Sequence, residues 1–159
     1  MFLEARSNID PFLYDDVQSC FEWIKNVQNM QVAILTNEII CLCPSSRLYP
    51  YTNISMRAAD IGTAKPSLIP FIAICQRTGV NPSRILYIGN NYLNDVVSSK
   101  MSGMKAAYIR RTGRVVDLTY DEDFKNYQII PYIEINNLEY SEILNKIKNL
   151  LSEDQLLSR

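Results

Sequence analysis

The sequence predicts an α/β fold in which a mostly parallel sheet lies between two layers of helices. Three short apolar segments, 31–37 ("QVAILTN"), 84–89 ("RILYIG") and 105–111 ("KAAYIRR"), have the character of strands that are buried on both faces. Segments with helical periodicity separate these strands, and this alternation is typical of parallel βαβ units. A length of 159 residues suits one domain that spans 1–159.

The first helix is predicted over about residues 16–29, where apolar residues recur at helical spacing. Asp15 or Asp16 can cap its first turn, because an aspartate side chain accepts a backbone N–H bond there. A strand follows at once and ends in polar Thr36 and Asn37, which predicts a loop at its carboxyl end.

The segment 38–64 is the hardest to assign, since "CPSSRLYPYTN" carries turn signals whereas "ISMRAADIG" is compatible with one or two helical turns. The next helix is predicted over 65–79, with its prolines confined to the opening turn and Gly79 at its C-terminal end. One face of this helix carries Leu68, Ile72 and Cys75.

After the strand over 84–89, "LNDVVSSKMSG" predicts a helix that ends at Gly103. The third strand leads to a polar loop over about 114–126, and "YQIIPYIEI" then predicts a peripheral strand, because Pro131 suits an edge. The segment "LEYSEILNKIKNLL" (138–151) closes the fold as an amphipathic helix. Its inward face is expected to carry Ile143, Ile147, Leu150 and Leu151.

A net charge of −1, with 47% hydrophobic and 21% charged residues, is the composition of an ordinary soluble protein and disfavours nucleic acid as a partner. No apolar run approaches the roughly 20 residues that span a bilayer, so no membrane partner is expected. The N-terminus lacks the pattern of a signal peptide, and the cytosol is the expected compartment.

The chain has no histidine and four cysteines. Without an imidazole base, Ser-His-Asp and Cys-His hydrolysis are unavailable to the chain alone. The cysteines lie mostly in apolar segments, as buried reduced thiols do, and Cys41-x-Cys43 has no second pair near it to complete a zinc site. Any chemistry must therefore come from Asp, Glu, Lys, Ser, Thr or Cys.

Polar residues collect after the strands, which is where ligands bind in open parallel sheets. Thr36 and Asn37 follow the first strand, Gly89 to Asp95 follow the second, and Lys65 lies on the loop that enters the intervening helix. Thr36 offers a hydrogen bond to a phosphoryl oxygen, and Lys65 neutralises its charge. Asp95 is suited to orient the lysine or to help hold a cation. Each residue alone has an ordinary structural explanation, but their order and spacing favour a site.

These segments resemble the haloacid dehalogenase (HAD) superfamily. "VAILTN", "GTAKPS" and "IAICQRTGVNPSRILYIGNNYLNDVVSSKMSGMKAAYIRR" are similar to the C-terminal two-thirds of such a domain, over about residues 11–150. The resemblance implies a Rossmann-like three-layer fold and Mg²⁺-dependent hydrolysis of phosphomonoesters. By position, Thr36, Lys65 and Asp95 would be catalytic, and Thr36, Asn37 and Lys65 would bind the phosphate.

The first motif of the family is missing. In the family an apolar strand runs into Asp-x-Asp, whose first aspartate is the nucleophile and a metal ligand and whose second is the general acid/base. The early candidate here, Asp10 in "RSNIDPF", follows a polar stretch and has Phe12 where the second aspartate would fall. We therefore expect little activity from the chain alone.

The fourth motif is altered, because Gly89 is followed by Asn90 where the family has aspartate. Asn90 and Asp95 would then be the remaining metal ligands. They should hold Mg²⁺ poorly, since this ion is bound through carboxylates and substrate phosphates. The pocket is expected to tolerate a phosphate anion better than it gathers a metal.

The missing strand is the central one in the family, between the strands that carry Thr36 and Gly89. Without it, these two strands must pair directly, accept "MFLEA" (1–5) as a substitute, or await another chain. Unpaired strand edges promote association, so we expect a homo-oligomer or a partner chain that completes the sheet.

Two functions of different classes stay open at this point. One is a phosphatase-type hydrolase by descent that is impaired in this chain, acting on a phosphorylated small molecule. The other is a non-enzymatic module that binds a phosphate-bearing ligand or a protein. A third interpretation assigns no function and takes the chain as an incomplete gene product without a selected role. "RRTGR" (110–114) is predicted to be a solvated loop rather than an anion contact.

Overall fold

The computed structural model describes residues 9–26, 30–38, 42–111, 119–139, 142 and 145–146. The strands are β1 (Ala33–Thr36), β2 (Ile54–Arg57), β3 (Leu86–Gly89), β4 (Lys105–Ile109) and β5 (Ile133–Ile135). The α-helices are α2 (Asp15–Asn26), α3 (Ala58–Ile61), α4 (Ile69–Thr78), α5 (Ser98–Met101) and α6 (Tyr120–Tyr127). Short 3₁₀ turns are η1 (Asp10–Phe12), η2 (Tyr49–Tyr51) and η3 (Pro82–Arg84), and η4 (Tyr92–Val97) is π-helical. None of the helices in these ranges is long and apolar enough to cross a membrane.

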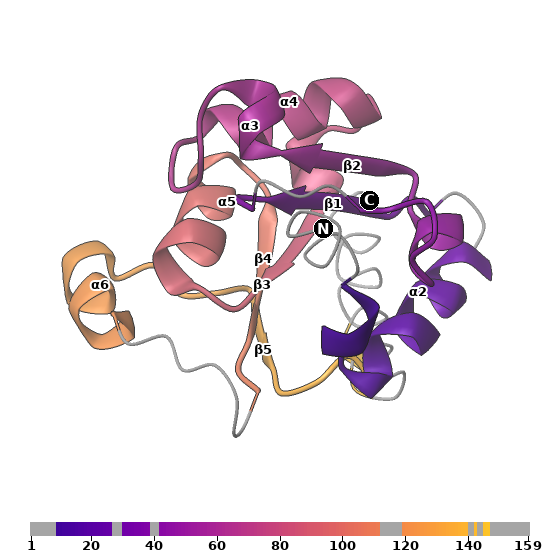
Figure 1. Cartoon of the computed structure of the whole chain (residues 1–159). Helices are drawn as coiled ribbons and strands as arrows, with labels where there is room; N and C mark the ends of the chain where they lie inside the picture. Colours follow the sequence, from indigo (N-terminus) through magenta and orange to yellow (C-terminus); the bar gives the residue numbers. More distant parts are fainter. Residues whose placement is uncertain are drawn as a thin grey trace, which may run out of the picture.

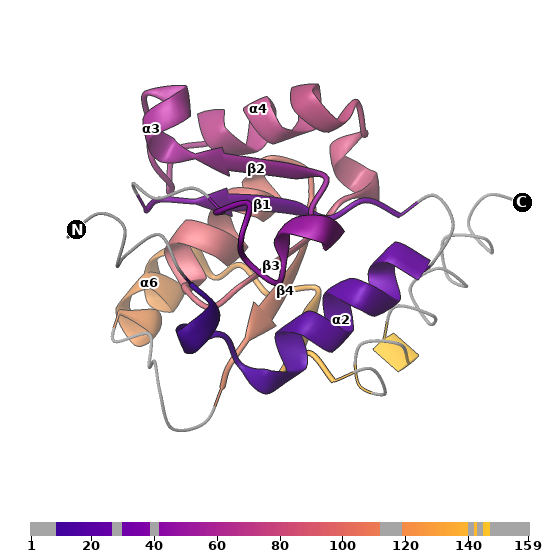
Figure 2. The same ribbon diagram turned by 45° about the vertical axis from the view of Figure 1, so that its right-hand side comes forward.

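Every strand pairing in the described residues is parallel, as the sequence predicts. β1 pairs with β2, from Ala33 opposite Ile54 to Thr36 opposite Arg57. β3, β4 and β5 form a second sheet in that order. In Figures 1 and 2, α3 and α4 cover one side of the β1–β2 pair and α2 lies on the other. The three-layer α/β prediction is confirmed.

Apolar residues fill both sides of the sheets. On the α4 side, Phe71 and Ile74 pack with Met56 of β2. On the α2 side, Cys20 packs with Ala107 of β4. Because strands between two helical layers are buried on both faces, their sequences are continuous apolar runs rather than alternating ones.

β1 and β3 do not pair with each other. They belong to separate sheets, and no backbone hydrogen bond joins them in the described part of the chain. The Leu35 carbonyl of β1 accepts instead from the side-chain hydroxyl of Tyr87 in β3, at 3.5 Å. Of the three alternatives for the missing strand, direct pairing of β1 and β3 is therefore wrong. The alternative with residues 1–5 lies outside the described residues, and the alternative with another chain stays a prediction.

The segment 54–61 differs from its assignment as helical turns. Residues Ile54–Arg57 form β2, and the helix α3 is confined to Ala58–Ile61. Pairing with β1 decides this, because Ile54 and Met56 gain ladder bonds and core contacts that a local pattern does not reveal. α3 then ends at Gly62, whose φ of 81° is the left-handed conformation that glycine tolerates.

The prediction of a polar loop over about 114–126 is wrong in its second half, where helix α6 forms instead (Figure 1). Three acidic residues stand in the first turn of α6, where negative charge favours a helix. Tyr120 and Phe124 of this helix pack against Tyr92, with ring centroids 5.2 and 5.8 Å from it. Helices depend mainly on such tertiary packing, which a polar sequence does not indicate. Residues 112–118 lie outside the described residues.

α4 ends at Gly79 as predicted, with a left-handed φ of 67°. Phe71 and Ile74 form its buried face. Ile72, which the sequence placed on the inward face, is 51% exposed. The helix carries two apolar stripes, and only the packing on β2 decides which of them is buried. The helix predicted over 138–151 lies mostly outside the described residues.

Arg111 is not part of a solvated loop, contrary to the prediction. Its guanidinium donates two hydrogen bonds to Asp16, at 2.7 and 2.8 Å, and stacks 3.9 Å from the ring centroid of Tyr14. Burial by itself would raise the pKa of Asp16, but the bonds from Arg111 and from the Leu138 N–H lower this pKa below its ordinary value. The pair ties the start of α2 to the end of β4.

Candidate functional site

Polar side chains from three segments meet at the carboxyl ends of β1 and β3. Lys65 Nζ donates to Asp95 Oδ1 at 2.6 Å and to the Tyr87 hydroxyl at 2.9 Å. The side chains of Lys65 and Asp95 are only 11% and 7% exposed. The fold thus brings together the lysine and the aspartate that the sequence singled out, and it adds a tyrosine.

The Asp95 carboxylate is bonded through both of its oxygens. Oδ2 accepts from the Asn91 backbone N–H at 2.9 Å, and Oδ1 lies 3.3 Å from the Tyr87 hydroxyl in addition to its bond from lysine. Asp95 lies in η4, and π-helical turns occur frequently at functional sites. Gly89 makes room for it, since a Cβ at residue 89 would come within 2.3 Å of Asp95 Cγ.

Tyr87 is the site residue that sequence reasoning missed. Its ring packs edge-on against Phe71 with centroids 5.0 Å apart. Burial, and then the nearby Asp95 charge, raise the pKa of Tyr87 above its ordinary value, so the phenol stays protonated and donates. Sequence reasoning missed Tyr87 because an aromatic residue inside an apolar strand indicates a core position. It could have been found because a buried tyrosine hydroxyl needs a hydrogen-bond partner.

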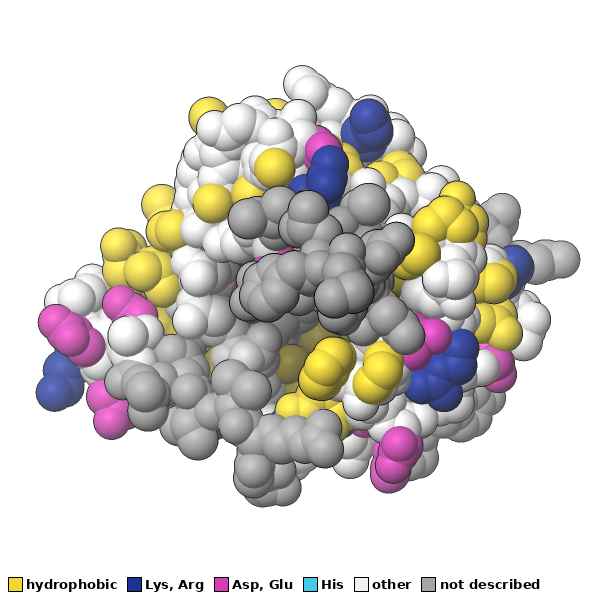
Figure 3. Space-filling model, viewed as in Figure 1, with side chains coloured by type: hydrophobic (Ala, Val, Ile, Leu, Met, Phe, Trp, Pro, Cys, Tyr) yellow, Lys and Arg dark blue, Asp and Glu magenta, His cyan; other side chains and the backbone are white. Residues whose placement is uncertain are grey.

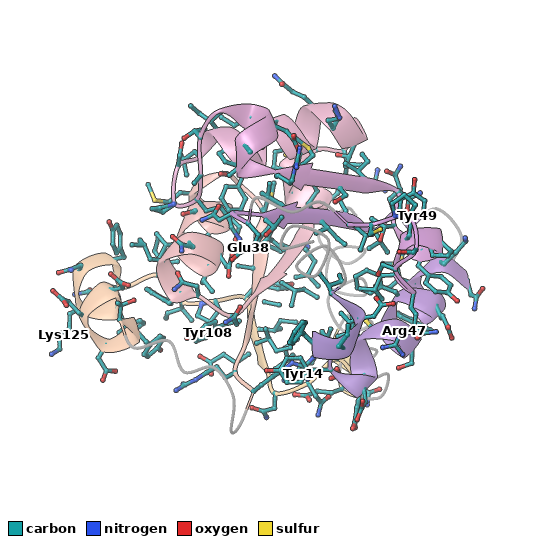
Figure 4. The ribbon with its side chains drawn as sticks, viewed as in Figure 1. Tyr14, Glu38, Arg47, Tyr49, Tyr108 and Lys125 are labelled. Atoms are coloured by element: carbon teal, nitrogen blue, oxygen red, sulfur yellow. The ribbon has the colours of Figure 1, made fainter. Side chains whose placement is uncertain are left out.

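Thr36 and Asn37 shape the loop after β1. Asn37 Nδ2 donates to the Lys65 carbonyl at 3.0 Å, and the Lys65 N–H donates back to Asn37 Oδ1 at 2.9 Å. The Thr36 hydroxyl oxygen accepts a hydrogen bond from the Glu38 N–H at 3.0 Å. Glu38 is labelled close to the end of β1 in Figure 4. Asn37 therefore positions the lysine loop, while contacts of Thr36 and Asn37 with phosphate stay predictions.

Asn90 is exposed and lines a hollow of about 160 Å³ with Tyr14, Ile109 and Arg111. Across the described ranges, no three His, Cys, Asp or Glu residues come close enough to hold a metal ion. The Asp95 carboxylate is already bonded to a lysine and a backbone N–H, and Asn90 adds only an amide. These residues do not fit Mg²⁺, which demands carboxylate or phosphate oxygens in near-octahedral geometry.

Asp10, the early aspartate, does not follow a strand. It lies in η1, where it accepts from the Ser46 hydroxyl at 2.7 Å and from the Arg47 N–H at 3.0 Å. The bonds from Ser46 and Arg47 lower the pKa of Asp10 below its ordinary value. Asp121-Glu122-Asp123 has the spacing of the family's first motif but lies on helix α6, not at the end of a strand. Neither segment therefore supplies a nucleophile in the family's position.

A three-layer parallel α/β domain with its polar residues beyond the strand ends is the architecture in which open sheets bind and transform ligands. The chain matches the model of the family described as haloacid dehalogenase-like hydrolase over residues 6–109, and it belongs to that family. The resemblance read from the sequence is confirmed. None of the curated proteins compared with the chain matches it.

Solved structures share the fold. A 2-haloacid dehalogenase from Pseudomonas syringae pv. Tomato DC3000 has a TM-score of 0.68 and 22% identity, covering 87% of this chain and 54% of that chain. A HAD phosphatase from Thermococcus onnurineus has a TM-score of 0.64 and 20% identity, covering 95% and 64%. A HAD hydrolase from Bacillus subtilis bound to magnesium has a TM-score of 0.63 and 20% identity, covering 85% and 55%. The chain thus spans 54–64% of these structures, and the likeness shows the fold alone.

Proposed function

We propose that this HAD-like hydrolase domain is of the phosphatase type by descent, that it does not hydrolyse phosphomonoesters by itself, and that its site binds a phosphate-type anion without a metal. The state of Asp95 supports this most directly. Both of its oxygens are bonded to donors of the chain, so it serves as the partner of Lys65 rather than as an attacking group. Carboxylate-based nucleophilic catalysis needs a carboxylate that is free to attack.

The purified chain is expected to hydrolyse p-nitrophenyl phosphate in Mg²⁺ no faster than buffer does. Hydrolysis through an aspartyl phosphate cannot proceed without the aspartate that attacks the phosphoryl group. Release of p-nitrophenol is the measurement, with an active HAD phosphatase as the positive control. Turnover that depends on Mg²⁺ and is lost in Lys65→Met would contradict this part of the proposal.

The anion-binding part depends on the donors that Lys65 and Thr36 retain. An ammonium group has three N–H donors, and Asp95 and Tyr87 use two of those of Lys65. The Thr36 oxygen accepts a bond, and in the described residues its O–H has no acceptor. A charge-assisted bond from lysine and a hydroxyl bond are the kind of contact that holds a phosphate oxygen. The Asp95 charge opposes the lysine charge, so binding should be weak.

Phosphate should shift the NMR signals of Thr36 and Lys65 in the metal-free chain. Lys65→Met removes the charge at similar volume and should weaken the apparent affinity by about fivefold or more. Asn90→Asp adds a carboxylate near the strand ends, which should weaken phosphate binding while increasing the shifts caused by Mg²⁺, without restoring turnover.

Lys125→Met is the matched control for this titration. It removes the same charge from α6. Figure 4 shows Lys125 at the left edge of the molecule, well away from Glu38 at the end of β1, so this change should leave phosphate binding unchanged. Equal shifts in all four proteins, or none near Thr36 and Lys65, would limit the resemblance to fold and descent.

A protein-binding function is the second candidate, and the separation of β1 from β3 favours it. Nucleic acid stays disfavoured: on the face seen in Figure 3, lysine and arginine side chains stand singly among acidic ones. The free thiols of Cys20, Cys43 and Cys75 suit a reducing compartment, so the cytosol is the compartment that we propose.

A further inference from the structure

A second hollow, of about 670 Å³, lies between strand β2 and the helices α3 and α4, which lie side by side over β2 in Figure 2. We call it the α3–α4 hollow, and the residues that line it are Ser55, Met56, Asp60, Ile61, Ala73, Gln76 and Arg77. Pockets that bind small molecules have volumes of about 300–1,000 Å³. The α3–α4 hollow is therefore large enough for a small organic ligand.

The apolar part of the lining comes from all three elements. Met56 of β2 is buried and packs with Phe71 and Ile74 of α4. Ile61 of α3 and Ala73 of α4 pack against the same cluster but are only partly buried. Covering such apolar surface is favourable by about 25 cal/mol per Å², so the hollow suits a ligand with an apolar body.

The acidic residue of the lining is already paired. The Arg57 guanidinium donates to the Asp60 carboxylate at 2.5 and 3.0 Å, and the Arg57 backbone N–H donates to it at 3.1 Å. These bonds are the main reason why the pKa of Asp60 lies below its ordinary value, and the charge of Arg77 lowers this pKa further. The Asp60 charge is thus balanced by a residue outside the lining.

Arg77 gives the lining a positive charge that is not balanced in this way. Within the part of the chain that the structure describes, its guanidinium forms no hydrogen bond or ion pair, and the side-chain amide of Gln76 likewise has no partner. The planar guanidinium fork matches a carboxylate, and an amide N–H adds a neutral donor. One positive charge matches one negative charge. A phosphate ester would bring a second negative charge close to Asp60, so a carboxylate fits better.

We propose that the α3–α4 hollow binds a small organic carboxylate with an apolar body. Arg77 and Gln76 hold the carboxylate, and the body covers the apolar lining. Because Arg77 is exposed, water and salt screen its charge, and the affinity is expected to be low. The inference does not depend on the proposed phosphate site, because Thr36 and Lys65 are not among the lining residues.

The test titrates the full chain with phenylbutyrate and with phenylbutyramide, its neutral amide. The two probes share the apolar body and differ in charge. Phenylbutyrate should shift the NMR signals of the methyl groups of Met56, Ile61 and Ala73. It should also bind about fivefold or more tightly than the amide, because only the carboxylate pairs with Arg77.

An Arg77→Gln variant removes the charge and keeps a polar side chain that is compatible with a helix. It should weaken phenylbutyrate binding by about fivefold and leave phenylbutyramide binding unchanged. Arg84→Gln is the matched control, since Arg84 is also exposed but does not line the hollow. This control should change the binding of neither probe.

An Ala73→Leu variant tests the apolar part of the hollow. The larger side chain fills the space beside α4 and should weaken both probes by about threefold or more. Leucine is a good helix former and Ala73 is only partly buried, so the far-UV spectrum should stay unchanged. The two arginine variants keep the test decisive if this variant does not fold.

Three results would overturn the proposal. Equal affinity for the two probes would mean that the hollow is an apolar surface without carboxylate recognition. Equal losses in Arg77→Gln and Arg84→Gln would mean that the overall charge attracts the probe. The absence of shifts at Met56, Ile61 and Ala73 would mean that the hollow binds no carboxylate of this kind.

Discussion

An Asp95→Asn variant is expected to have a free energy of unfolding about 3 kcal/mol lower than that of the wild type. This value is the low end of the cost of breaking a buried ion pair. Lys65 would keep its charge at 11% exposure while losing the carboxylate 2.6 Å away. The asparagine oxygen can still accept one bond, which places the cost at the low end of the range. Urea denaturation with and without phosphate is the measurement. Phosphate should stabilise this variant more than the wild type, because the anion replaces the missing charge.

Asp60→Asn is the matched control for this variant. Asp60 pairs with Arg57, but its side chain is 44% exposed, and exposed pairs contribute little to stability. Its loss should therefore be clearly smaller than the loss in Asp95→Asn. Similar small losses in both variants would show that water screens the Lys65–Asp95 pair and that the site is more open than the structure indicates.

Gly89→Ala is expected to cost about 3 kcal/mol, at the upper end for overpacking, although it adds one methyl group. The new Cβ would lie 2.3 Å from Asp95 Cγ and 2.4 Å from Asp95 Cβ, so η4 must move away from β3. That movement also lengthens the bond from Lys65 to Asp95. The melting temperature and the NMR signal of Lys65 should change together.

Gly62→Ala separates this clash from the general cost of replacing a glycine. Gly62 has a left-handed φ of 81° but no atom within 4 Å of an added Cβ, so its replacement should cost about 1 kcal/mol. If Gly89→Ala costs no more than Gly62→Ala, the close packing of Asp95 on β3 is not a constraint on the site.

The local order of the elements follows from the sequence. Apolar runs separated by helical periodicity predict β1, β3 and β4 with the helices between them, and Gly79 predicts the end of α4. The convergence of Lys65 and Asp95 also follows, because residues after parallel strands share one edge of a sheet. These features depend on short-range pattern and on one rule of topology, so a single chain suffices to predict them.

The tertiary structure decided the rest. β2 is a strand because β1 lies beside it, and α6 is a helix because Tyr92 packs against it. Whether Lys65 meets a metal, a substrate or a carboxylate depends on a bond to a residue 30 positions away. Tyr87 joins the site for the same reason, because its hydroxyl finds Lys65 only once β3 lies next to the loop after β1.

The relation of β1 to β3 shows the division most clearly. The resemblance predicted that the family's central strand is missing and left three ways of closing the sheet. Backbone groups pair only when another strand lies within reach, and this depends on where the helices hold β1 and β3. The structure holds these two strands in separate sheets, so direct pairing is ruled out by geometry that no local pattern encodes.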